Sequence, residues 1–120
     1  MNRTEKGEVK VIPVDLNQDV DEVVIDDIAN LTGTRGLRVS VVTFPPGSRR
    51  PWSSHDQDQY IWPLNGRGVL ITQRGEVAIE AGSLVYLPAG VTHQHGAAEG
   101  SSFTQLSVIG GERKEEPEEV

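Results

Sequence analysis

The sequence predicts an all-β domain, an antiparallel sandwich or barrel of short strands. About eight to ten short apolar segments follow one another at regular spacing with turn residues between them, which is the pattern of such folds. No segment shows a clear helical period. The 120 residues include 13 Gly and 7 Pro, and both residue types are typical of tight turns between strands.

The first half of the chain contains one clear strand, residues 37–44 (LRVSVVTF), in which apolar and polar residues alternate before both faces become apolar. Residues 9–14 (VKVIPV) are predicted as a strand whose proline favours a sheet edge. A weaker strand is expected at residues 22–26. Residues 30–36 (NLTGTRG) have the composition of a turn.

The second half supplies the remaining strands. Residues 59–64 (QYIWPL) are strand-like, although Pro63 removes a ladder donor and indicates an edge or a bulge. Asn65-Gly66 is a strong hairpin signal, so a turn is expected there. Further strands are expected at residues 69–73, 76–80, 84–87, 91–95 and 103–109.

Composition limits the class of protein. The length fits one domain, expected over residues 1–111, with residues 1–7 frayed and residues 112–120 (ERKEEPEEV) forming an acidic disordered tail. The absence of cysteine excludes disulfides and thiolate metal sites. The net charge of -7 disfavours nucleic-acid binding. No apolar leader and no membrane-length apolar run occurs, so we expect a cytoplasmic protein without membrane contact.

Two spaced motifs give the sequence a family resemblance. In the second motif of the cupin superfamily, Gly is followed by five residues, Pro-x-Gly, two residues and His. The matching residues here are Gly82, Pro88, Gly90 and His93. In the first motif, His-x-His is followed by three or four residues, Glu or Gln, six residues and Gly. His55, Gln59 and Gly66 match its second half. Residues 37–109 therefore resemble a cupin.

The resemblance implies a double-stranded β-helix, also called a jelly-roll barrel, with its core at about residues 37–109. It implies a pocket in which His55, Gln59 and His93 are metal ligands. The family's other first-motif histidine corresponds to Ser53, and Gln59 replaces the more common Glu. The run HQHGA at residues 93–97 and the context of Trp52 are similar to small cupins related to quercetin dioxygenase and to carboxymuconolactone-decarboxylase-associated cupins. Small cupins commonly dimerise through N-terminal strands, so we expect a homodimer paired through residues 9–14.

The residue types allow metal chemistry. Two imidazoles and one carboxamide oxygen can hold a divalent Fe, Mn, Ni or Zn ion with open positions. Because Ser53 replaces a histidine and no carboxylate is present, the affinity should be lower than that of a complete set, or the metal absent. His95 has the same strand parity as His93. It is a candidate fourth ligand or a catalytic acid/base, and Tyr60 is a candidate proton donor.

Other side chains are candidates for substrate binding beside Ser53. Arg49 could attract an anionic substrate, but adjacent arginines are more often a solvated patch. Trp52 and Trp62 could wall a pocket for an aromatic ligand, and core or dimer contacts are equally consistent with them.

Two classes of function follow. The first is a metal-dependent enzyme (dioxygenase, isomerase, cyclase or decarboxylase) acting on a small organic acid, phenol or enol. The second is a metal-free cupin that binds a small molecule, or that catalyses acid/base chemistry through His93 or His95. The fold does not decide between these chemistries.

Overall fold

The computed structural model describes residues 9–16 and 19–111, and within them it confirms the all-β prediction. The predicted frayed start and acidic tail lie outside these residues. The described elements are β1 (Val24–Asp27), α1 (Ile28–Thr32), β2 (Leu37–Phe44), β3 (Gln59–Thr72), β4 (Gly75–Glu80), β5 (Val85–Leu87), β6 (His93–Ala97) and β7 (Phe103–Gly110). No helix was predicted, and the short helix α1 ends within residues 30–36, which were predicted as a turn.

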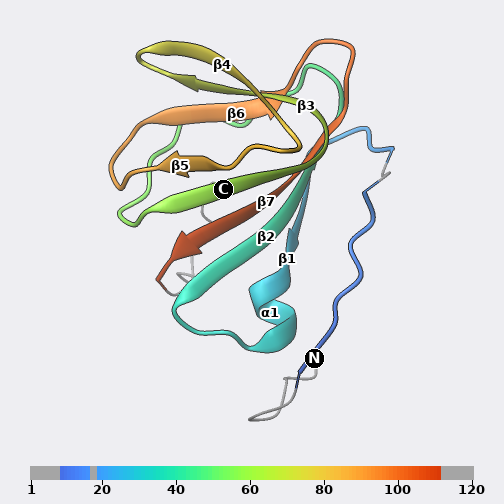
Figure 1. The fold of residues 1–120 in the computed structure, drawn as a ribbon, viewed down its shortest axis with the longest axis vertical. Coiled ribbons are helices and arrows are strands. Elements are labelled where there is room, and N and C mark those ends of the chain that lie inside the picture. Colours follow the sequence, from blue (N-terminus) through green and yellow to red (C-terminus); the bar gives the residue numbers. More distant parts are fainter. Residues whose placement is uncertain (1–8, 17–18, 112–120) are drawn as a thin grey trace.

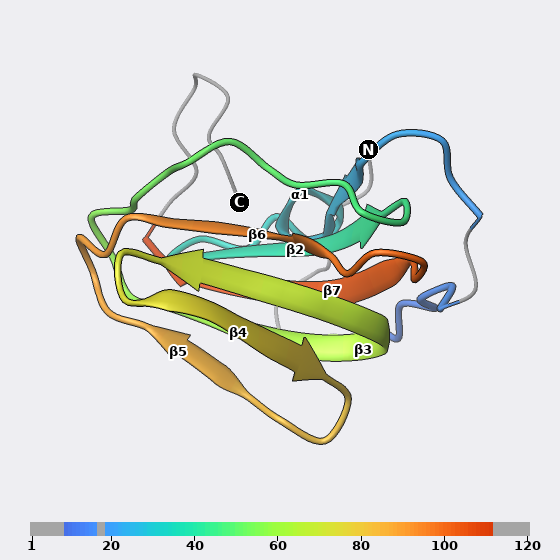
Figure 2. The same cartoon turned by 90° about the horizontal axis from the view of Figure 1, so that it is seen from above.

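The long strand β3 belongs to both sheets of the barrel. Its first half pairs with β7 and β5, and its second half pairs with β4 and β6. The first sheet continues from β7 to β2 and the edge strand β1. All these pairings are antiparallel. The two sheets therefore curl around one interior, as Figures 1 and 2 show.

The predicted hairpin at Asn65-Gly66 is wrong, because β3 runs through these residues without reversing. The pairing with β7 shifts register between Pro63 and Asn65, so the predicted irregularity at Pro63 is a bulge. Gly66 has a φ of +80°, and a Cβ there would lie 1.9 Å from the carbonyl oxygen of Ser102. Glycine is required here for close approach of two backbones where the strand crosses between sheets.

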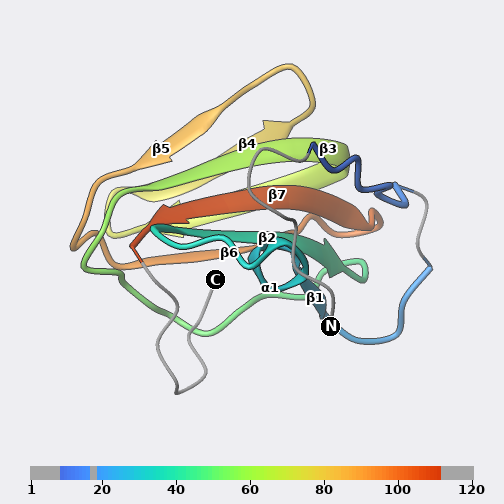
Figure 3. The same ribbon diagram turned by 90° about the horizontal axis from the view of Figure 1, so that it is seen from below.

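The expected strand at residues 9–14 does not form within the chain, which corrects that prediction. Residues 9–15 have no regular secondary structure, and Val9 and Val11 are exposed. The edge of the first sheet is occupied instead by β1, which pairs with β2. Figure 3 shows β1 and α1 beside β2, with the N-terminal segment away from the sheet edge.

The apolar part of the core fills one end of the barrel. Its buried members come from the six strands β2 to β7, and they are Val42, Phe44, Ile61, Leu70, Ile79, Leu87, Ala97 and Phe103. Burial of these side chains is the main stabilising term for the fold. No helix among residues 9–16 and 19–111 is long and apolar enough to cross a membrane.

Candidate functional site

Strand β6 brings two histidines into the barrel. His93 and His95 are 1% and 0% exposed, and their ring centroids lie 5.7 Å apart. Residues two apart on a strand point to the same face, so the predicted shared parity of these histidines is observed. The strand follows a turn at Gly90, whose φ of +86° suits glycine.

A segment before β3 places His55 beside them. Ser53 and His93 exchange two backbone hydrogen bonds, of 3.0 and 2.8 Å, so Ser53 lies directly opposite His93. The carbonyl of His55 accepts from the N–H of Gly90 at 2.8 Å. The rings of His55 and His93 are consequently 5.6 Å apart between centroids.

Gln59 enters the same interior from the start of β3. Its side chain is buried, and its Nε2 donates to the Oγ of Ser107 on β7 at 2.8 Å. This hydrogen bond fixes the amide and turns Oε1 away from Ser107. Within the described residues, the Oε1 of Gln59 has no hydrogen-bond partner although it is buried.

The two predicted imidazole ligands, His55 and His93, also present a buried atom without a hydrogen-bond partner. The Nε2 atoms of His55 and His93 are buried and accept or donate no hydrogen bond among the described residues. The Nδ1 of His93 contacts the carbonyl of Val91 at 3.0 Å. A carbonyl only accepts, so Nδ1 carries the proton and Nε2 presents a lone pair. A backbone partner of this kind typically orients a metal-binding histidine.

Two imidazole nitrogens and an amide oxygen are a donor set whose chemistry suits a divalent cation. A buried polar atom without a partner is costly, and electron-pair donors gathered in one interior are satisfied by a positive ion. Ser53 Oγ and Gln105 Oε1 are further unpartnered buried oxygens on residues that border the histidines. No group of three or more His, Cys, Asp and Glu side chains among the described residues is placed to hold a metal ion. The set therefore depends on the amide of Gln59.

His95 has a different environment from His93. The Nε2 of Gln105 lies 2.7 Å from its Nδ1, and Phe44 packs edge-on at 5.5 Å. An amide nitrogen only donates, so Nδ1 accepts and the neutral ring carries its proton on Nε2. Burial lowers the pKa of His95 to about 3, against the opposing hydrogen bond of Gln105. His95 is therefore neutral at pH 7.

An arginine that the motifs did not indicate lies near the site. Arg38 on β2 is buried, and its Nη2 donates to the carbonyl of Gly110 at 3.1 Å. Burial, then the neighbouring His93 and Arg38, lower the pKa of His55 to about 4, and Asp56 opposes this shift. His55 is therefore also held neutral at pH 7.

Several predicted residues lie away from this interior. Tyr60 and Trp62 point to the outer face of β3, opposite to Gln59, and are 46% and 54% exposed. Tyr60 instead pairs with Tyr86, with ring centroids 5.4 Å apart. Trp52 is exposed on the segment before β3. The structure does not bring these side chains to the histidines.

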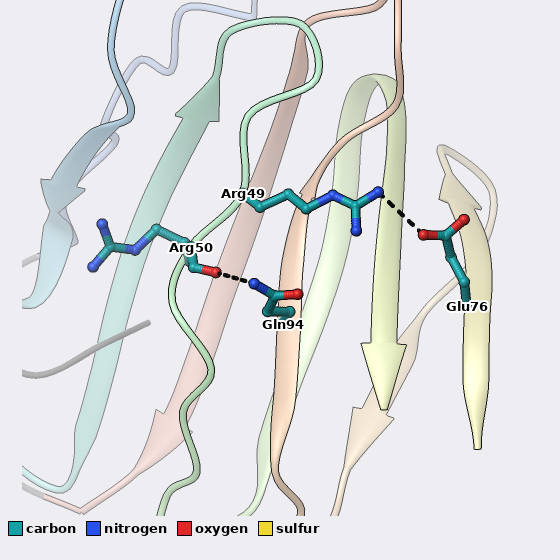
Figure 4. A network of polar contacts seen from close by, with 4 residues as sticks. All are labelled: Arg49, Arg50, Glu76 and Gln94. Atoms are coloured by element: carbon teal, nitrogen blue, oxygen red, sulfur yellow. Dashed lines mark hydrogen bonds and ion pairs between the residues drawn. The ribbon is translucent and has the colours of Figure 1, made fainter. Parts of the chain in front are cut away.

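Arg49 also points away from the barrel interior. Its Nη2 lies 3.1 Å from Oε1 of Glu76 on β4, and both side chains are largely exposed. Figure 4 shows this pair, with Arg50 directed to the other side and its carbonyl bound by Gln94. Ser53 is the one predicted substrate-binding residue that borders the histidines.

Sequence reasoning missed the polar side chains of the first sheet. They are buried on the inner faces of β2 and β7, and they are Arg38, Ser40, Gln105 and Ser107. The alternation within each strand contained a usable signal, since these residues share the parity of Phe44 or Phe103.

The family assignment rests on a comparison with known proteins. Residues 40–109 match the family described as Cupin domain, and this is more than half of the chain. The chain therefore belongs to the cupin domain family, as its motifs predicted.

One curated protein is similar to part of the chain. The chain is 35% identical over 68 residues to an (R)-mandelonitrile lyase of Granulicella tundricola, over 56% of this chain and 52% of that protein. It thus spans about half the length of this curated relative.

Solved structures share the fold. A cupin-like protein of Thermotoga maritima has a TM-score of 0.64 at 24% identity, covering 78% of this chain and 77% of that one. An RmlC-like cupin family protein of Methanocaldococcus jannaschii, with a double-stranded β-helix fold, has a TM-score of 0.70 at 15% identity, covering 88% and 94%.

Proposed function

We propose that this chain is a metal-dependent cupin enzyme that transfers a proton to or from a small hydroxylated substrate, an organic acid, phenol or enol. The observation that carries the proposal is that three donor atoms, His55 Nε2, His93 Nε2 and Gln59 Oε1, are buried without a hydrogen-bond partner among the described residues. These residues would hold a divalent Fe, Mn, Ni or Zn ion. Such an ion supplies a Lewis acid that lowers the pKa of a bound hydroxyl group.

The chain's own residues supply the rest of the proposed chemistry. Gln105 fixes His95 so that Nε2 is the proton-carrying atom of the neutral ring. Ser107 fixes the amide of Gln59. His95 is the proposed catalytic acid/base. Because burial lowers its pKa, it gives up a proton readily once charged, and a bound anion would raise that pKa.

The lyase relative supports proton transfer over oxygen chemistry. Mandelonitrile is an aromatic compound with a hydroxyl and a nitrile on one carbon, and its cleavage begins with removal of the hydroxyl proton. The likeness to this relative covers 68 residues at 35% identity. We therefore place a lyase-type reaction ahead of the dioxygenase, isomerase, cyclase and decarboxylase alternatives.

A screen of metal-loaded protein on mandelonitrile and small 2-hydroxy acids tests the proposal. We expect turnover that is abolished by a strong chelator and by His93→Ala. His95→Ala should also abolish turnover while leaving the metal content unchanged, because His95 is placed to move a proton and not to hold the ion. Turnover that survives both chelation and His93→Ala would contradict the metal-dependent proposal.

Ser53 favours a second candidate, a metal-free cupin that binds a small molecule through hydrogen bonds. Ser53 lies directly opposite His93, and its Oγ is buried without a hydrogen-bond partner among the described residues. A ligand with several hydroxyl groups would satisfy the same atoms as a metal ion. This candidate predicts that purified protein contains no stoichiometric metal, and that a bound small molecule is released on denaturation.

A further inference from the structure

A cavity opens at one end of the barrel beside the candidate site. Its volume is about 570 Å³, within the usual range for small-molecule pockets. It lies between the β3–β4 turn and the loop that leads from β5 into β6. We call it the vestibule, and its lining residues are Leu70, Thr72, Gln73, Arg74, Tyr86, Leu87, Pro88, Gly90, Val91 and Thr92.

The vestibule is lined in part by strand β3, which pairs with the histidine-bearing strand β6. Thr72 pairs with His93 and Leu70 pairs with His95 across β3 and β6. Residues directly opposite in an antiparallel pair share a face. Leu70 is 8% exposed and belongs to the core, so the vestibule reaches the barrel interior. The histidines themselves are not among the residues that line the vestibule.

The lining is largely apolar with one charge. Leucine, proline, valine and tyrosine side chains form most of it, and Arg74 is the one charged residue among those that line the vestibule. Arg74 lies in the β3–β4 turn, where its backbone N–H donates to Thr72 Oγ1 at 3.1 Å. No described residue forms an ion pair with its guanidinium, whereas Arg49 is paired with Glu76.

A largely apolar cavity with one arginine in its lining favours ligands that combine an apolar body with an anionic group. A flat apolar body gains most from leucine and tyrosine surfaces, and a carboxylate is matched by the planar donors of arginine. On a chain of net charge -7, an isolated guanidinium is a local site of attraction for an anion.

We propose that the vestibule binds small aromatic carboxylic acids, with the ring against Leu87 and Val91 and the carboxylate at Arg74. This inference names the substrate class of the proposed function. It rests on that function only for the statement that the bound acid reacts.

Binding of phenylacetate and of its neutral isostere phenylacetamide tests the proposal. Titration calorimetry is done on chelator-treated protein, so the result does not depend on a metal ion or on turnover. We expect phenylacetate to bind more tightly than phenylacetamide. Arg74→Gln should weaken phenylacetate binding by about two- to fivefold, as expected for an exposed ion pair, and should leave phenylacetamide unchanged.

Arg49→Gln is the matched control, because it removes the same charge at the exposed pair with Glu76. It should change neither affinity. Thr92→Trp, at an exposed lining position, should weaken both ligands by filling the chamber. Equal losses in Arg74→Gln and Arg49→Gln would overturn the proposal, as would phenylacetate binding that is unaffected by Thr92→Trp.

The two proposals fail separately. Selective binding of the acid at Arg74 without any turnover of metal-loaded protein contradicts the proposed enzyme activity and leaves the vestibule assignment standing. Turnover of neutral substrates by protein that does not prefer phenylacetate contradicts the vestibule assignment alone.

Discussion

His93 and His95 lie two residues apart on one strand, yet their rings are prepared for different tasks. The carbonyl of Val91 holds the proton of His93 on Nδ1, so its Nε2 offers a lone pair to the interior. Gln105 donates to Nδ1 of His95, so the proton of that ring lies on Nε2. The local partner of each ring, rather than its position in the motif, separates a proposed ligand from a proposed acid/base.

The buried histidines predict how stability depends on pH. The pKa values of His55 and His95 are lowered to about 4 and about 3 in the folded state, mainly by burial. The unfolded state binds these protons near pH 6.5, so stability is present above that pH and is lost as the pH falls toward 4. For metal-free protein, we expect His95 to contribute a slope of up to about 1.4 kcal/mol per pH unit.

Urea unfolding between pH 7.5 and pH 4.5 measures this slope. The variant His95→Gln keeps a polar side chain that can bond Gln105 but cannot be charged, so its slope should be shallower than that of the unmodified chain. An identical slope in the two proteins would contradict the assignment of His95 as a neutral buried group.

At the residue scale, the motif spacing predicted His55, Gln59 and His93 as one ligand set, and this assignment stays a prediction. His55 lies beside His93, because the N–H of Gly90 binds the carbonyl of His55 and Ser53 pairs with His93. Gln59 is buried at the start of β3, where its amide binds Ser107. The inner polar residues Arg38 and Gln105 were missed. Alternation normally indicates an apolar inner face, whereas this barrel buries polar side chains around its site.

At the scale of elements, β3 carries most of the architecture. It pairs with four other strands and changes from one sheet to the other within a single run. Asn-Gly is a local hairpin signal, but here the bulge at Pro63 and the crossing at Gly66 replace a reversal. Sequence patterns predicted most strands in their observed places. They failed at this point because pairing with distant strands, which no local window contains, decides the path.

Substitution of Gly66 tests the crossing. In Gly66→Ala, the new Cβ would meet the carbonyl oxygen of Ser102 at 1.9 Å, in addition to the strain of a φ of +80°. We expect the free energy of unfolding to fall by about 3 kcal/mol or more. Chemical denaturation of the two proteins measures the loss.

Gly75→Ala is the control, because Gly75 has a φ of +124° but no atom within 4 Å of the added Cβ. It should cost about 1–2 kcal/mol through backbone strain alone. An equal fall in the free energy of unfolding for the two variants would contradict a steric requirement for glycine at position 66.

At the scale of the whole molecule, the exposed apolar side chains of the described residues include two groups that bear on pairing with another chain. Val9 and Val11 project from the N-terminal segment with exposed fractions of 87% and 88%. Tyr60, Trp62 and Tyr86 form an aromatic group on the outer face of the first sheet. Exposed apolar groups of this kind are typical of surfaces that pair with another chain.

The homodimer predicted through residues 9–14 stays a prediction with a direct test. Light scattering at micromolar concentration should give twice the 13.1 kDa mass of the chain. Exchange of Val9 and Val11 for aspartate should return the mass to that of one chain, because charges on an edge segment oppose strand pairing. A monomeric mass for the unmodified chain, or dissociation by Trp62→Glu alone, would contradict edge pairing.

The central claim is that His55, Gln59 and His93 bind one divalent metal ion, and elemental analysis of purified, tag-free protein tests it most directly. We predict about one metal ion per chain, lost in His93→Ala and retained more tightly in Ser53→His, since residue 53 lies directly opposite His93. Protein that is empty as purified, and that gains metal only in Ser53→His, would contradict the claim and identify a barrel that works without a metal ion.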